Sequence, residues 1–117
     1  MFGFGSAKPV SEKILWSIIF PLACNLTEIE DANGTVAAFE ALPKRLDVYC
    51  KKNNIKLTKE DSNMVSITVQ SLIGAEMIAK MANDVKESGI LKFSDLDIQT
   101  AKHILQKKVE LFMSLKK

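Results

Sequence analysis

Residues 14–24 form the run ILWSIIFPLAC, in which Ser17 is the single polar side chain. Ser11 precedes the run and can cap a helix that starts after Pro9. Eleven helical residues rise only ~16 Å, about half of a bilayer core, so the run is too short to span a membrane. A helix that is apolar on every side belongs at the centre of a bundle, and Pro21 is expected to kink or restart it.

The same run has a second interpretation as the signal of an exported protein. Lys8 lies before the apolar residues, and Leu22-Ala23-Cys24 resembles a signal that ends at a lipid-modified cysteine, although Glu12 interrupts the basic leader. The alternative to a cytoplasmic protein is therefore an exported or membrane-associated accessory lipoprotein that uses residues 14–24 as signal or insertion element.

Three more helices are expected downstream of this run. The turn signal Asn33-Gly34 precedes a second helix, which Thr35 caps, which Pro43 interrupts and which ends at Asn53-Asn54. A third helix covers residues 59–87, and a fourth follows Ser94. The fourth carries one apolar stripe, formed by Ile98, Ala101, Leu105, Val109, Phe112 and Leu115.

Length and composition then set the fold class. A chain of 117 residues with 47% apolar and 26% charged residues is long enough to bury about two-thirds of its surface. We therefore predict an all-α fold, a single-domain bundle of about four helices with one long central helix, over residues 1–117. Residues 1–8 are expected to be a mobile tail, with Phe2 and Phe4 as an alternative docking arm.

The third helix is the most informative element, because it carries two apolar strips. Twenty-nine residues would span ~43 Å, more than the ~35 Å diameter of a compact domain, so the helix overshoots or bends, and Gly74 is the obvious place to bend. The main strip is Met64, Ile67, Ala75, Ile78, Ala82 and Val85. The second strip is Val65, Val69, Ile73 and Met77. Either the bundle covers both strips, or the second is an interface for a partner helix or a second copy.

Charge and reactive side chains exclude several functions. Sixteen basic and fourteen acidic residues give a net charge of +2, and Arg45 is the single arginine, so specific nucleic-acid binding is not expected. Cys24 and Cys50 are expected to be small buried residues in a reducing compartment, with one disulfide between them as the alternative. The single histidine, His103, lies opposite the apolar stripe of its helix. We therefore expect no catalytic, cofactor or metal site.

The sequence thus favours a non-enzymatic interaction protein that works through apolar helix surface. We expect an adaptor, chaperone, inhibitor or subunit, cytoplasmic and homo-oligomeric, that self-associates through Val65, Val69, Ile73 and Met77 of the long third helix.

Overall fold

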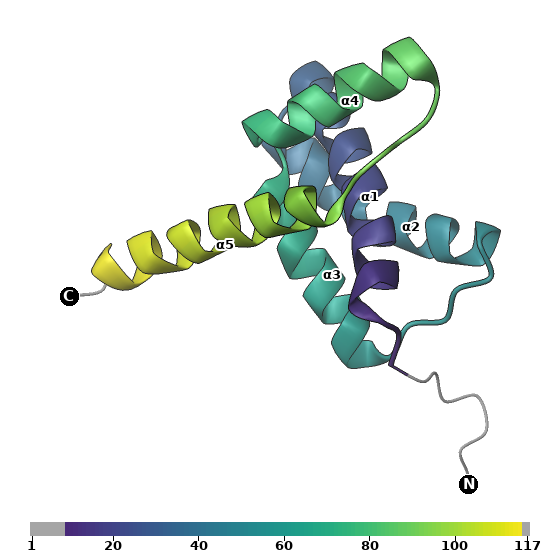
Figure 1. Cartoon of the computed structure of the whole chain (residues 1–117), viewed down its shortest axis with the longest axis horizontal. Helices are drawn as coiled ribbons and strands as arrows, with labels where there is room; N and C mark the ends of the chain where they lie inside the picture. The colour runs from purple at the N-terminus through teal and green to yellow at the C-terminus, as the bar shows by residue number, and fades with distance from the viewer. Residues whose placement is uncertain (1–8, 116–117) are drawn as a thin grey trace, which may run out of the picture.

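The computed structural model describes residues 9–115, and every regular element in that range is an α-helix (Figure 1). The all-α bundle is confirmed, with five helices in this range rather than about four. They are α1 (Glu12–Asn33), α2 (Thr35–Lys52), α3 (Lys59–Leu72), α4 (Glu76–Ser88) and α5 (Asp95–Leu115). Phe2 and Phe4 lie outside the described residues, so the docking arm stays a prediction.

Helix α1 is the centre of the bundle, as its apolar run requires. It packs against α2, α3 and α4, and residues 15–24 are buried apart from the half-buried Ser17 and Pro21. Ser11 caps the helix, its side chain accepting a hydrogen bond from the Ile14 amide at 3.2 Å. Among residues 9–115 no helix is both long and apolar enough to cross a bilayer.

Pro21 does not restart α1, because another helix takes over the hydrogen bond that proline removes. A proline has no amide hydrogen, so the carbonyl four residues earlier, that of Ser17, loses its helical donor. The Tyr49 hydroxyl of α2 donates to this carbonyl at 3.1 Å. Pro43 likewise leaves α2 continuous, and there the carbonyl that loses its donor belongs to Phe39 on an exposed turn.

The predicted helix over residues 59–87 is divided at Gly74. Helix α3 ends at Leu72 and α4 begins at Glu76, with Gly74 at φ +81°, a backbone conformation that favours glycine. The Gly74 amide donates to the buried Thr27 hydroxyl of α1 at 3.0 Å, so α1 fixes the turn. The bend expected at Gly74 is therefore a complete break, which explains the fifth helix.

The cap predicted at Thr35 is wrong. Gly34 occupies the N-cap position of α2, Thr35 is the first residue of the helix, and its hydroxyl donates to the Glu30 carboxylate at 3.1 Å. The other helix ends are capped by nearby residues. Thr58 accepts from the Asp61 amide at 3.0 Å at the start of α3, and α4 ends at Gly89 in the left-handed conformation. At the start of α5, the Asp97 carboxylate accepts from the Ser94 amide at 2.8 Å.

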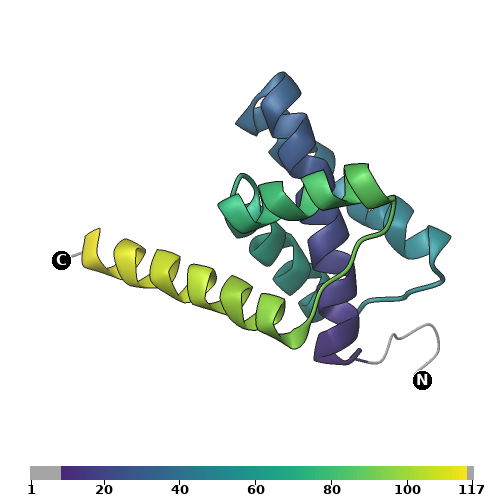
Figure 2. The ribbon, with the colours of Figure 1, turned by 45° about the horizontal axis from the view of Figure 1, so that its top comes forward.

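Helix α5 leaves the bundle. The segment before it is held by Phe93, whose ring lies 5.0 Å from that of Phe20 in the core. From there α5 packs mainly against α3 and continues outward, so its C-terminal half stands clear of the other helices in both views (Figures 1 and 2). The radius of gyration is 14.9 Å, whereas a compact chain of this length has about 13 Å, in agreement with one projecting element.

Candidate interaction surface

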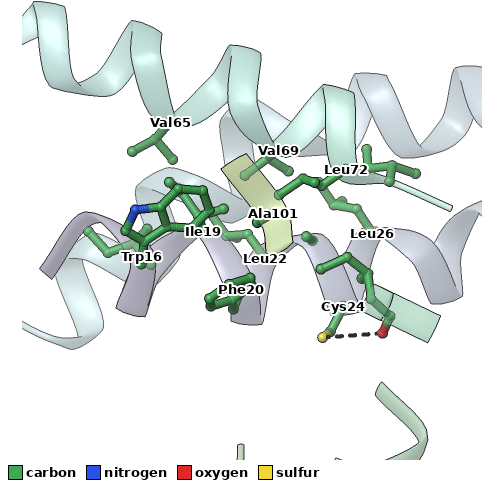
Figure 3. Packing of buried hydrophobic residues seen from close by; sticks show 14 of the residues in the cluster. Trp16, Ile19, Phe20, Leu22, Cys24, Leu26, Val65, Val69, Leu72 and Ala101 are labelled. Carbon is green, nitrogen blue, oxygen red and sulfur yellow. Dashed lines mark hydrogen bonds between the residues drawn. The ribbon is translucent and has the colours of Figure 1, made fainter. Parts of the chain in front are cut away.

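The strip predicted as a partner interface lies inside the fold. Val65 and Val69 are completely buried, Ile73 is nearly so, and Met77 is half-buried. Figure 3 shows Val65 and Val69 of α3 directed toward the side chains of α1. The expectation that this strip faces outward is therefore wrong, because α1 is apolar on several sides and α3 covers one of them. Val65, Val69 and Ile73 offer no free surface to a partner in this fold, whereas Met77 remains partly exposed.

The strip predicted to be internal is exposed on α3. Met64 is 55% exposed and Ile67 is 64% exposed, whereas Ile78 and Ala82, the members of the same strip on α4, are buried. The break at Gly74 explains the difference, because α3 and α4 are separate helices that each turn a different strip toward α1. We call Met64 and Ile67 the α3 flank.

The apolar stripe of α5 passes from the core into solvent. Ile98 and Ala101 are buried and Leu105 is half-buried, as expected for a helix that packs on a bundle. Beyond them, the apolar side chains are between 57% and 76% exposed: Val109, Leu111, Phe112, Met113 and Leu115. We call residues 106–115 the overhang. Its length gave no signal of this exposure, because a helix of 21 residues spans ~32 Å, less than the ~35 Å diameter of a compact domain.

The overhang is apolar over more of its circumference than one neighbouring helix requires. At 100° per residue, its apolar side chains occupy an arc of ~200°, which also contains Lys108, whereas a core-facing stripe is often little more than ~100° wide. The opposite side of α5 is polar, with exposed His103, Gln106, Lys107 and Glu110, and Gln106 donates to Glu110 at 3.1 Å. The overhang is thus a strongly amphipathic helix whose apolar side no helix within residues 9–115 covers.

A hydrogen bond joins the overhang to the α3 flank. The Lys108 ammonium donates to the Ser71 carbonyl, in the last turn of α3. Lys108 thereby supplies positive charge to a helix C-terminus that has no basic residue of its own. Ile67 and Met64 lie four and seven residues before Ser71, on the same side of α3. We refer to the overhang and the α3 flank together as the apolar corner.

The thiols are chemically quiet. Both cysteines are free, and Cys24 is buried with its sulfur 3.8 Å from the Ile78 carbonyl (Figure 3). Burial, with a smaller contribution from the charge of Glu28, raises the pKa of the Cys24 thiol to about 11. Burial and the charge of Asp47 also raise the pKa of Cys50. Nucleophilic cysteines need a lowered pKa, so neither environment activates its thiol.

The acidic residues near the end of α1 form no catalytic pair. Glu28, Glu30 and Asp31 lie in the last turns of the helix. Glu28 pairs with Lys86 of α4 at 3.3 Å, and Glu30 accepts a hydrogen bond from the Thr35 hydroxyl at 3.1 Å. Within residues 9–115, no group of three or more His, Cys, Asp or Glu side chains is arranged to hold a metal ion.

A groove of about 910 Å³ lies between α2 and the start of α3. Its charged lining residues are three lysines, Lys51, Lys56 and Lys59, together with Asp47, which pairs with Lys51 at 3.1 Å. General acid–base catalysis requires groups with matched pKa values within reach of one substrate. The groove offers one carboxylate, already paired, and no histidine, so we assign no catalysis to it.

Comparisons with known proteins add no assignment. No family model, curated protein or solved structure matches the chain. The apolar corner is therefore the feature from which a function can be inferred.

Proposed function

We propose that this chain is a non-enzymatic helical protein–protein interaction module, and that the apolar corner is its docking surface. The observation that carries the proposal is the single stripe of α5, whose first members are buried in the core and whose last members extend beyond it. The same stripe needs apolar neighbours along its whole length, and the other helices supply them only at its start.

Energetics support a macromolecular partner. Complete burial of a large aliphatic or aromatic side chain contributes about 1.5–3 kcal/mol, so covering the exposed ~60% of the five overhang side chains contributes roughly 5–9 kcal/mol. Association itself costs about 4–15 kcal/mol in lost freedom of motion. A stable complex therefore requires a partner that contributes apolar surface of its own.

The alternative of an inserted or cleaved N-terminal element has less support. The run over residues 14–24 supplies the centre of the core, and α2, α3 and α4 all pack on its helix. Insertion of this run into a membrane would require the bundle to open.

Photocrosslinking in the native cells tests the proposed function. A photoreactive residue at position 113, on the overhang, is expected to give covalent adducts. The same residue at position 36, an exposed apolar position on α2, is the matched control and is expected to give none. If position 113 gives no more adduct than position 36, the overhang is not a docking surface.

A further inference from the structure

We propose that the groove between α2 and the start of α3 binds an acidic segment of a partner protein, one that carries apolar side chains between its carboxylates. This inference goes beyond the proposed function, because it concerns a second surface. At 100° per residue, the groove residues Ser62 and Ser66 lie ~150° around α3 from Met64 and Ile67 of the α3 flank. The groove and the apolar corner are therefore open to separate tests.

The chain concentrates its positive charge at this groove. Residues 43–59 hold six of the sixteen basic residues and one of the fourteen acidic residues, a formal net charge of +5, whereas the remaining ten basic and thirteen acidic residues give −3. This segment runs from α2 through the connecting loop to the start of α3 and supplies most of the groove lining (Figure 1). A hollow lined by one sign of charge attracts ligands of the opposite sign, so the groove favours an anionic occupant.

Two of the groove lysines are available to pair with that occupant. Lys51 already pairs with Asp47 at 3.1 Å. Lys56 and Lys59 are exposed and form no ion pair within residues 9–115. Lys56 lies in the loop, and Lys59 is the first residue of α3. Two carboxylates of one bound segment therefore find partners without displacing an existing ion pair.

Two serine hydroxyls of α3 lack a partner in the fold. Serines inside helices often donate to a carbonyl one turn earlier, as Ser17, Ser71 and Ser88 do at 2.6–2.9 Å. Ser62 and Ser66 are half-buried in the groove lining, yet within residues 9–115 their hydroxyls form no hydrogen bond. They lie one turn apart on the same side of α3, so both hydroxyls are placed to donate to oxygen atoms of a ligand in the groove.

The apolar part of the lining defines the rest of the occupant. Leu46 is buried, and Cys50, Ile55 and Leu57 are half-buried. Exposed ion pairs contribute little on their own, so a purely acidic ligand would bind weakly. A segment that covers these side chains with its own apolar residues, while its carboxylates pair with the lysines, matches both parts of the lining. The volume of about 910 Å³ has room for several side chains of such a segment.

Two other occupants fit the groove less well. Recognition of a nucleic-acid strand uses aromatic side chains that stack on bases and arginines that bind phosphate. Within residues 9–115 the groove lining contains neither, and its apolar part would face a phosphate backbone. Residues 1–8 of this chain are also a poor match, because they contain Lys8 and no acidic residue.

Peptide selection on the full chain is the first test. A phage-displayed library of random peptides is selected on wild-type protein in the presence of excess soluble Lys59→Glu protein, which removes peptides that bind elsewhere on the chain. We expect the surviving peptides to be enriched in aspartate and glutamate together with leucine, isoleucine or phenylalanine. In the matched control the competitor is Lys107→Glu, the same charge change at an exposed position of α5, and it should remove these peptides.

The affinity of a selected peptide, measured by fluorescence anisotropy, then tests the charge. Lys59→Glu should weaken binding about tenfold at low salt, because an attraction becomes a repulsion, whereas Lys107→Glu should change it by less than about twofold. Raising the salt concentration from about 0.05 to about 0.5 M should weaken binding to wild type more than binding to Lys59→Glu. Glutamate is favourable in the first turn of a helix, so Lys59→Glu should keep the wild-type circular dichroism spectrum.

Removal of both groove hydroxyls tests where the peptide lies. Ser62→Ala combined with Ser66→Ala should weaken binding about fivefold, because two donors to the peptide are lost. The substitutions remove no side-chain hydrogen bond within residues 9–115, and alanine is favourable inside a helix, so the fold should be kept.

Three results would overturn this inference. The first is a selection that returns no acidic peptides, or acidic peptides without apolar residues. The second is an equal loss of affinity in Lys59→Glu and Lys107→Glu, or an unchanged affinity in the double alanine variant. The third is binding of polyuridine RNA that Lys59→Glu weakens, with no acidic peptide selected, which would identify nucleic acid as the occupant.

The proposed function is tested separately by the adducts from position 113. Lys59→Glu should leave those adducts at the wild-type level, because the groove is not part of the apolar corner. Absence of the adducts would contradict the proposed function and leave peptide binding at the groove intact.

Discussion

Pro21 and Tyr49 show how one residue can repair the defect that another creates. Pro21 lies in the middle of the most buried helix, where loss of a backbone hydrogen bond is costly. The Tyr49 hydroxyl reaches the Ser17 carbonyl from α2 and replaces the missing donor. The proline therefore creates a polar attachment point between the middle of α1 and α2.

This interpretation predicts a coupling that a double-mutant cycle can measure. Tyr49→Phe should cost about 1 kcal/mol of unfolding free energy, because the Ser17 carbonyl loses its donor while partly buried. In a Pro21→Ala background the alanine amide supplies the helical hydrogen bond, so the same substitution should cost less than half as much. Urea denaturation of the four proteins gives the coupling energy. A cost of Tyr49→Phe that is the same in both backgrounds would contradict this account.

The buried Cys24 thiol predicts how stability depends on alkaline pH. Burial raises its pKa from an ordinary value of 9.0 to about 11 in the folded chain, so the unfolded chain loses this proton first as pH rises. The contribution is complete below about pH 9 and is lost progressively up to about pH 11, by roughly 2 kcal/mol. Cys24→Ala should flatten this decline, measured by urea unfolding at intervals from about pH 8 to about pH 11. Cys50→Ala, at a half-buried position, is the control; equal slopes in the two variants would refute the assignment.

At the scale of elements, the break at Gly74 determines which surface the chain exposes. Two strips along residues 59–87 were visible in the sequence, but periodicity alone does not say which strip a neighbour covers. The choice depends on α1, whose need for apolar contacts on several sides is a tertiary effect. The caps at Ser11, Thr58 and Ser94 were predictable because each depends on residues three positions apart. The orientation of α3 was not, because it depends on a turn held by Thr27 from another helix.

The break also predicts an unequal effect of alanine at two glycines. Gly74 and Gly89 both have positive φ, at +81° and +76°, so alanine at either should cost about 1–2 kcal/mol of unfolding free energy. A Cβ at Gly74 would also meet the Glu30 carboxylate oxygen at 2.7 Å, whereas a Cβ at Gly89 meets nothing within 4 Å. Chemical denaturation should therefore show Gly74→Ala to be the more damaging, with Glu30→Ala reducing the difference. Equal losses at the two positions would mean that Glu30 moves aside freely.

At the scale of the whole molecule, the core and the proposed docking surface are divided between the two halves of one helix. The first turns of α5 pack in the bundle, where Ile98 and Ala101 are buried. An ion pair between Lys102 and Glu12, at 2.5 Å, also joins this part of α5 to the start of α1. Within the overhang, Lys108 makes a polar contact with the bundle, donating to the Ser71 carbonyl. The two halves of α5 therefore share an axis, but the first half packs in the bundle and the second, the proposed docking surface, packs little against it.

That division predicts where the chain can be cut. A chain that ends at residue 105 keeps the packed residues Ile98, Ala101 and Leu105. Its free energy of unfolding should lie within about 1 kcal/mol of the wild-type value, because it loses the exposed overhang and the Lys108 contact. A chain that ends at residue 94 loses the buried pair and exposes the side of α3 that α5 covers, which should cost several kcal/mol. Thermal and urea unfolding of both shortened chains and of the wild type, at one low protein concentration, compare their free energies of unfolding. If the chain that ends at residue 105 does not fold, the overhang stabilises the bundle. Its apolar stripe would then be explained by folding rather than by a partner.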